Sequence, residues 1–175
     1  MHKLQQRPER VLALFITTHG IGYALFDGPL ILCDWGVMET KGKNKNKNDI
    51  GLRKTLFLCS WYRPDVLVVE DYEGKGSRKG KRVKSLIDMI VMHASSAHTP
   101  IAKHSRSQIR QCFASLRAVN KYEIATQIVT RLPELKGQLP PKRKIWKPED
   151  RRMSIFDAVS LAVCYFNLGV IASDT

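Results

Sequence analysis

The chain has 175 residues, which is enough for one domain and barely enough for two. Apolar residues make up 43% of it, which excludes a disordered tail or a low-complexity linker as the whole protein. The 29 Lys and Arg against 16 Asp and Glu leave a net charge of +13, which favours a polyanionic partner such as nucleic acid. No apolar stretch reaches the roughly 18–20 residues of a membrane-spanning helix, and the polar N-terminus lacks the core of a signal peptide. We therefore expect a cytoplasmic protein that faces nucleic acid rather than a membrane.

Three apolar segments near the N-terminus predict consecutive strands joined by short turns. They are Val11–Thr17, Tyr23–Phe26 and Leu30–Val37. Gly20 and Gly22 interrupt the first run, and Asp27-Gly28-Pro29 is a strong turn signal after the second. Two hairpins in series predict an antiparallel meander, in which Phe15 should pair near Tyr23–Leu25.

After this meander, strands alternate with helices. Val66–Val69 is a run of four aliphatic residues, typical of a strand that is covered on both faces. The remaining expected elements are helices at Ile50–Tyr62, Val83–Ala97, Ser107–Phe113, Lys121–Leu132 and Ser154–Gly169, a strand at Ile101–His104, and loops at Lys41–Asp49, Glu73–Arg82 and Pro133–Asp150. This order predicts one α/β domain over residues 1–175, with flexible ends at 1–9 and 170–175. Its mixed five-stranded sheet has three antiparallel strands, then parallel ones, with helices on both faces.

Cysteines give no sign of a metal site. The four cysteines lie far apart, with no CxxC or CxxxH pair, so reduced structural thiols are expected at Cys33, Cys59, Cys112 and Cys164.

Several motifs occur in an order that resembles RuvC-type Holliday-junction resolvases of the ribonuclease H-like superfamily. The opening strand, its turn and Gly22-Tyr23 are similar to the start of that family, and Pro64–Glu70 is similar to its fourth strand. Further similar segments are Pro100-Ile101 with Ser107–Gln111, then Lys121–Leu132, then Phe156–Ala162. The resemblance covers roughly Val11 to Phe166 and implies a ribonuclease H-like fold.

In that family the fourth strand ends in a metal-binding Glu, and an Asp of the final helix completes the site. The resemblance thus implies Glu70 and Asp157 as catalytic and metal-binding residues. Phe15 and Ser154 occupy positions where two further ligands are expected. Asp71 is a weaker candidate ligand beside Glu70. The resemblance therefore implies a divergent member with a degraded metal site.

Two-metal nucleases hydrolyse phosphodiesters with ions about 3.5–4 Å apart, which normally need three or four carboxylates. If the site were active, it would use Mg²⁺ or Mn²⁺. Other interpretations of these acids stay open. Ser154-Ile-Phe-Asp157 is a helix-start pattern, in which Asp157 would support a cap. Glu70 could instead form an ion pair with a Lys or Arg of the following loop.

Basic residues gather in three segments that are candidates for phosphate contacts. The first follows Glu70 and contains Lys75, Arg78, Lys79, Lys81, Arg82 and Lys84. The second contains Lys41, Lys43, Lys45 and Lys47. The third contains Lys142, Arg143, Lys144, Lys147, Arg151 and Arg152, and Trp146 among them could stack on an unpaired base.

The leading hypothesis is a RuvC-like protein that recognises branched or duplex DNA by shape and phosphate contacts, with catalysis weakened or lost. One alternative is an active metal-dependent junction endonuclease of DNA recombination, and another is an RNA-binding protein on the same fold. The resemblance also implies a homodimer formed through the helix at Val83–Ala97, where Met89, Ile90 and Met92 could supply an apolar face.

Overall fold

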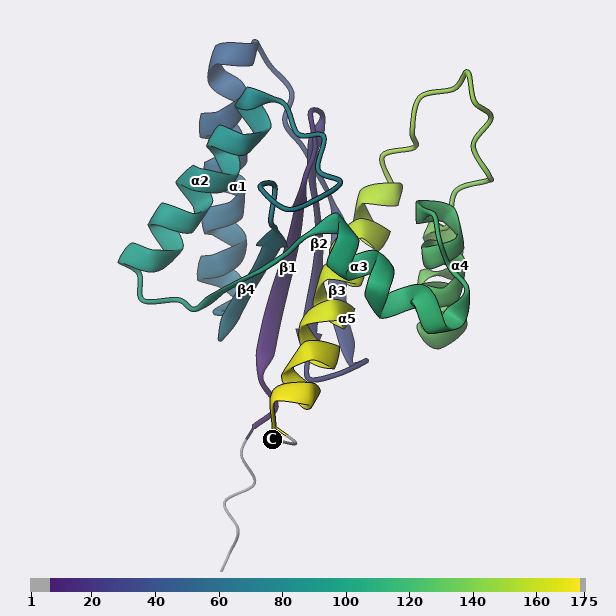
Figure 1. The fold of residues 1–175 in the computed structure, drawn as a ribbon. Helices are drawn as coiled ribbons and strands as arrows, with labels where there is room; N and C mark the ends of the chain where they lie inside the picture. The colour runs from purple at the N-terminus through teal and green to yellow at the C-terminus, as the bar shows by residue number, and fades with distance from the viewer. Residues whose placement is uncertain (1–6, 174–175) are drawn as a thin grey trace, which may run out of the picture.

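The computed structural model describes residues 7–173 and forms one five-stranded sheet flanked by helices (Figure 1). The strands are β1 (Arg10–Ile16), β2 (Gly20–Asp27), β3 (Leu32–Glu39), β4 (Val66–Glu70) and β5 (Ile101–His104). The helices are α1 (Asn44–Tyr62), α2 (Lys81–Ser96), α3 (Arg106–Phe113), α4 (Lys121–Arg131) and α5 (Met153–Ser173), with 3₁₀ turns at Ala114–Leu116 and Pro133–Gln138.

The sheet order is β3-β2-β1-β4-β5. β1 pairs antiparallel with β2 and parallel with β4, and β4 pairs parallel with β5. This confirms the predicted meander followed by parallel strands. The hairpin register differs slightly from the prediction, because Phe15 lies opposite Gly22. β3 also begins two residues late, since Leu30 adopts a left-handed conformation with φ of 58° that cannot continue a strand.

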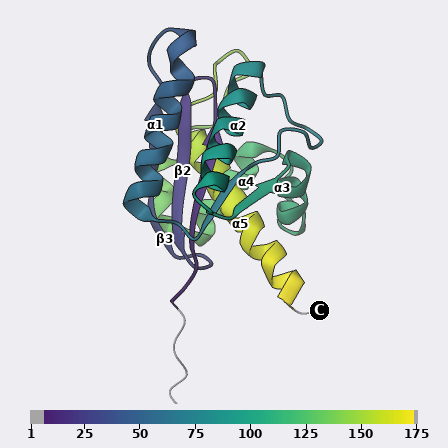
Figure 2. The same ribbon diagram turned by 90° about the vertical axis from the view of Figure 1, so that its left-hand side faces the viewer.

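Helices cover both faces of the sheet, as predicted (Figures 1 and 2). Alternation along β1 assigns its side chains to two cores: Leu12 and Leu14 pack beneath α1 and α2, whereas Ala13 and Phe15 pack beneath α3, α4 and α5. All of these residues are buried. Phe15 therefore lies on the α5 side of the central strand.

One loop boundary was wrong: α1 begins at Asn44, so most of the segment Lys41–Asp49 is helical. Lys and Asn do not strongly oppose a helix, and Gly42, with φ of 137°, makes the turn that precedes it. Within this first turn and a half, Asn48 donates to the carbonyl of Arg82 and accepts from its guanidinium. This contact holds the start of α1 against the start of α2.

The N-terminal turn of α5 lies directly on β2. A Cβ atom added to Gly22 would come within 2.2 Å of the carbonyl oxygen of Ser154, so only glycine permits this approach. The contact fixes where α5 crosses the sheet and places Asp157, one turn later, above β1.

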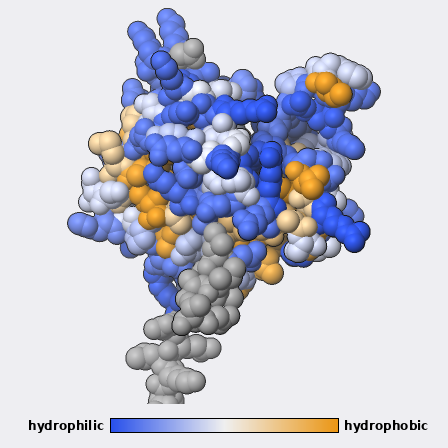
Figure 3. Space-filling model, viewed as in Figure 1, coloured by the Kyte–Doolittle hydropathy of each residue, from blue (hydrophilic) through white to orange (hydrophobic). Residues whose placement is uncertain are grey.

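The apolar face expected on α2 is only partly available for dimerisation. Ile90 is 2% exposed and packs in the core under α2, because the sheet needs that face covered. Met92 is 68% exposed and stays a candidate for the predicted dimer contact. Hydrophilic residues dominate the view of the surface in Figure 3, with apolar groups between them. Within the described residues, no helix is long and apolar enough to cross a membrane.

His104 generates a prediction about stability and pH. It is buried at the end of β5, and neither ring nitrogen has a hydrogen-bond partner among the described residues. Burial lowers the pKa of His104 below its usual 6.5, so the unfolded chain binds a proton more readily than the folded one. The free energy of unfolding should therefore fall as the pH drops from 7 to 5.

Chemical denaturation across this range should show a shallower pH dependence for His104→Leu than for the wild type. Carboxylates with a lowered pKa, such as Asp27 and Glu39, lose their contribution to the free energy of unfolding only below about pH 4.5. They therefore do not affect the slope between pH 7 and 5. An unchanged slope in the variant would assign the dependence to another group.

Candidate functional site

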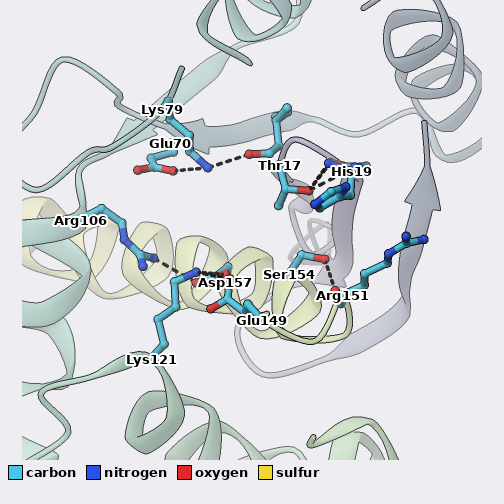
Figure 4. Close-up of polar contacts among 12 residues, drawn as sticks. Thr17, His19, Glu70, Lys79, Arg106, Lys121, Glu149, Arg151, Ser154 and Asp157 are labelled. Carbon is cyan, nitrogen blue, oxygen red and sulfur yellow. Dashed lines mark hydrogen bonds and ion pairs between the residues drawn. The ribbon is translucent and has the colours of Figure 1, made fainter. Parts of the chain in front are cut away.

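Two buried carboxylates lie on the α5 side of the sheet. Glu70 ends β4 and is 2% exposed, and Asp157 lies in α5 and is 5% exposed. Glu70 follows Val66 and Val68 at alternate positions, and both valines face the core under α5. The structure thus places the two acids that the resemblance singled out on the same face (Figure 4). The ring of Phe15 lies close to Lys79 and Lys121, which contact these acids.

Lys79 reaches back from the glycine-rich segment after β4 to Glu70. Its Nζ lies 3.0 Å from Oε2 of Glu70 and donates a hydrogen bond of 2.6 Å to the carbonyl of Ile16. Among the described residues no donor is directed at Oε2 with hydrogen-bond geometry, so the contact with Lys79 is an ion pair. Burial lowers the pKa of Lys79, and the negative charge of Glu70 opposes this shift. An ammonium group therefore neutralises the carboxylate at the end of β4.

Asp157 is neutralised by two cations. Arg106 Nη1 contacts Oδ1 at 3.0 Å, and Lys121 Nζ contacts Oδ2 at 2.9 Å. Lys121 also contacts Glu149 at 3.1 Å, and this second contact links Asp157 to the loop before α5. The side chain of Arg106 is 16% exposed and that of Lys121 is 30% exposed, so both pairs are largely shielded from solvent.

Both of these cations occupy the first position of a helix, and each helix start is fixed by a capping box. Ser105 and Gln108 exchange side-chain and backbone hydrogen bonds before α3. Asn120 and Glu123 do the same before α4. Local sequence thus determines where α3 and α4 begin, and tertiary packing directs their first side chains towards Asp157.

The aromatic ring of Phe15 lies beneath all three cations. Lys79 Nζ is 3.6 Å from the ring centroid, Lys121 Nζ is 5.2 Å away, and the guanidinium carbon of Arg106 is 5.6 Å away. Each distance is within the roughly 6 Å range of a cation–π contact, which stabilises by about 0.5–2 kcal/mol depending on desolvation. Phe15 therefore interacts with cations at a position where the resemblance expects a metal ligand.

The alternative interpretations of the two acids have different outcomes. The ion pair anticipated for Glu70 is confirmed by its contact with Lys79. The helix-cap interpretation of Asp157 is wrong: α5 begins at Met153, and the Ser154 hydroxyl donates to the carbonyl of Arg151 rather than accepting at a cap. The carboxylate of Asp157 is directed at cations instead.

Other acids do not complete the pair. Asp27 forms an ion pair with Arg10 at the opposite end of β1 from Phe15. Asp34 accepts hydrogen bonds from two tyrosine hydroxyls on the other side of the sheet, and Asp71 accepts from the backbone amide of Glu73. Among the described residues no group of three His, Cys, Asp or Glu side chains is placed to hold a metal ion.

These donors do not fit two divalent ions. Mg²⁺ and Mn²⁺ prefer carboxylate and other hard oxygen ligands, and a two-ion site needs an acid that bridges both ions. The position where the resemblance implies that bridging acid is Phe15, and Glu70 and Asp157 are both in contact with protein cations.

The basic segments differ in how exposed their side chains are. Lys75, Arg78 and Lys81 are exposed, whereas Lys79 is committed to Glu70 and Arg82 donates to the carbonyl of Thr18. Every residue from 141 to 150 is exposed, including Lys142, Arg143, Lys144 and Trp146. Lys84 is half-buried and lies 5.5 Å from the ring of Tyr72. The predicted role of these residues in binding nucleic acid stays a prediction.

Sequence reasoning missed Arg106 and Lys121 as members of the site. They lie 51 and 36 residues from Asp157. The only available signal was the capping pattern, which places each at a helix start, and this pattern carries no information about the partner.

The chain's sequence matches no protein-family model and no curated protein. Its structure is similar to solved resolvases. RuvC of Thermus thermophilus in complex with a Holliday-junction substrate is 15% identical over 93% of this chain and 96% of that one, with a TM-score of 0.65. The yeast mitochondrial Holliday-junction resolvase Ydc2 is 14% identical over 91% and 79%, with a TM-score of 0.63. Fowlpox virus resolvase with its junction is 15% identical over 91% and 97%, with a TM-score of 0.52. The chain therefore has the fold of RuvC-type Holliday-junction resolvases.

Proposed function

We propose that this protein binds branched or duplex DNA through phosphate contacts and does not cleave it by a two-metal reaction. The observation that carries the proposal is the cluster of three cations, Lys79, Arg106 and Lys121, over the ring of Phe15. The fold supports DNA as the partner, because similar structures include two resolvases that were solved with Holliday-junction DNA.

Electrostatics argue against metal binding at the two acids. Lys79 already neutralises Glu70 and is held by the carbonyl of Ile16, so a divalent ion would have to displace it from two contacts. The same ion would face Arg106 and Lys121 near Asp157, and like charges repel strongly where solvent screening is weak. The remaining acids cannot compensate for this repulsion.

The arrangement of the basic segments supports joint contact with a polyanion. The start of α1, the segment 71–80 and the loop before α5 all lie towards the upper end of the sheet in Figure 1. Arg82 at the start of α2 contacts Asn48 of α1 and Thr18. Arg151 contacts Glu39, which also pairs with Lys41 just before α1. A positively charged surface favours the binding of nucleic acid, because each phosphate that it neutralises releases condensed counterions.

Binding without cleavage is the first test. A labelled four-way junction should bind and stay intact in Mg²⁺ or Mn²⁺, as followed by gel shift and denaturing gel. Affinity should fall by roughly a thousandfold between 50 and 200 mM salt if about six phosphates are contacted. Metal-dependent cleavage that Glu70→Gln abolishes would establish an active junction endonuclease instead. Tighter binding to structured RNA at the same salt would favour the RNA-binding alternative.

Loop cations should contribute to this salt dependence. Replacing Lys142, Arg143 and Lys144 together with Ala should reduce the slope of log affinity against log salt by about three units, because each neutralised phosphate contributes about 0.9. All three side chains are exposed, so the variant should fold normally. A slope that does not change would remove this loop from the interface.

The ion pair at Glu70 should be required for stability. Lys79→Met leaves a carboxylate buried without a cation and should lower the free energy of unfolding by about 3–5 kcal/mol. Adding Glu70→Gln should recover most of this loss, since the uncompensated charge is gone. Urea denaturation measures both effects, and Lys81→Met, at an exposed neighbouring position, serves as the matched control. Equal stability of Lys79→Met and the control would contradict a structural ion pair.

A further inference from the structure

The loop between residues 139 and 152 stands away from the body of the protein before α5 (Figure 1). All ten residues from 141 to 150 are exposed, and a backbone hydrogen bond of 3.0 Å from Lys147 to Lys144 closes a turn at the tip. Ile145 is 91% exposed and Trp146 is 77% exposed at this turn. In Figure 3 an apolar group stands out among hydrophilic ones on this projection.

Ion pairs fix the base of this loop. Glu149 contacts Lys121 at 3.1 Å, Asp150 contacts Arg152 at 2.8 Å, and Arg151 contacts Glu39 of β3. Glu149 and Asp150, the two acids of the loop, thus both form ion pairs at its base. Pro140, Pro141 and Pro148 restrict the backbone on either side of the tip. The contacts of Glu149 and Arg151 hold the base of the loop against α4 and β3.

Cations remain in excess nearer the tip. Within the described part of the chain, Lys142, Arg143, Lys144 and Lys147 form no ion pair within 4 Å of a carboxylate. Together with the first turn of α4 they line an open cleft of about 860 Å³ between the loop and that helix. Lys121 lies in the same cleft and connects it to Asp157. Glu149 and Asp150 also line the cleft, but cations outnumber them there. A concave surface of net positive charge suits a phosphate backbone better than it suits a flat lipid surface.

An exposed indole among cations adds a second kind of contact. Lys144 lies 5.5 Å from the Trp146 ring, and the rest of that side chain faces solvent. Bases inside a continuous duplex are stacked on each other and offer no free face away from the ends. A base that is unpaired or splayed at a branch does offer one, and aromatic stacking on such a base is tolerant of sequence.

We propose that the cleft binds the phosphates of a nucleic-acid strand and that Trp146 stacks on an unpaired base of that strand. The proposal rests on the proposed function and narrows it, because phosphate contacts would give affinity for any DNA and Trp146 would add preference for unpaired nucleotides. The chemical class of ligand is a strand with at least one unstacked base, as occurs at branches, forks and single-stranded ends.

Fluorescence anisotropy at fixed salt tests this with four labelled DNAs: a four-way junction with an unpaired centre, a fork, a single strand and a hairpin-closed duplex without free ends. Trp146→Ala should weaken binding to the first three by about 5- to 150-fold, the range for loss of one stacked base, and change binding to the closed duplex less than twofold. Trp146→Phe should recover most of the affinity.

Trp61→Ala is the matched control. Trp61 is also exposed, at 71%, but it lies on α1, where it stacks on Phe57 with 6.3 Å between ring centroids. This variant should bind all four DNAs as the wild type does. Because both tryptophans are exposed, neither substitution should impair folding, and a cooperative melt checks this.

The results distinguish stacking by Trp146 from DNA binding by the protein as a whole. Wild type that binds no nucleic acid would overturn both. Wild type that binds all four DNAs while Trp146→Ala has no selective effect would overturn only the role of Trp146. Protection of Trp146 from a soluble quencher by vesicles of anionic phospholipid, with no protection by single-stranded DNA, would identify a membrane contact and also overturn it.

Discussion

Burial of two carboxylates on one face of the sheet is the constraint on which the rest of this site depends. A buried charge is costly unless it is paired, so the chain must supply cations to Glu70 and Asp157. Three elements provide them: Lys79 from the segment after β4, Arg106 from the start of α3 and Lys121 from the start of α4. The helices on this face are therefore positioned by electrostatics as well as by apolar packing.

The central part of the fold could be predicted because its signals are local. The aliphatic run Val66–Val69 and the turn at Asp27–Pro29 fixed the buried parallel strand and the meander, and the order of elements then left few topologies. The start of α1 was missed because Lys and Asn are compatible with both loop and helix. The contact between Asn48 and Arg82, 34 residues apart, helps to hold that turn.

The site was predictable in part for the same reason. Glu70 could be paired with its following loop, because Lys79 is only nine residues away in sequence. The partners of Asp157 could not be found this way, because they come from distant helices and the Ser154 pattern suggested a local cap. Lys121 also connects the buried acids to the exposed loop before α5, because it contacts both Asp157 and Glu149. The buried cluster thereby holds the base of the exposed loop.

The charges around Phe15 restrict how this site could bind a divalent metal ion. Lys79, Arg106 and Lys121 face Glu70 and Asp157, and Lys121 also contacts Glu149, so three cations balance three carboxylates. A new acid at position 15 would stand beside cations that already have carboxylate partners. Each of the existing carboxylates would keep a protein cation as its counter-ion. A metal site here would therefore require the loss of cations as well as the gain of an acid, and neither change alone would free the carboxylates to bind a metal ion.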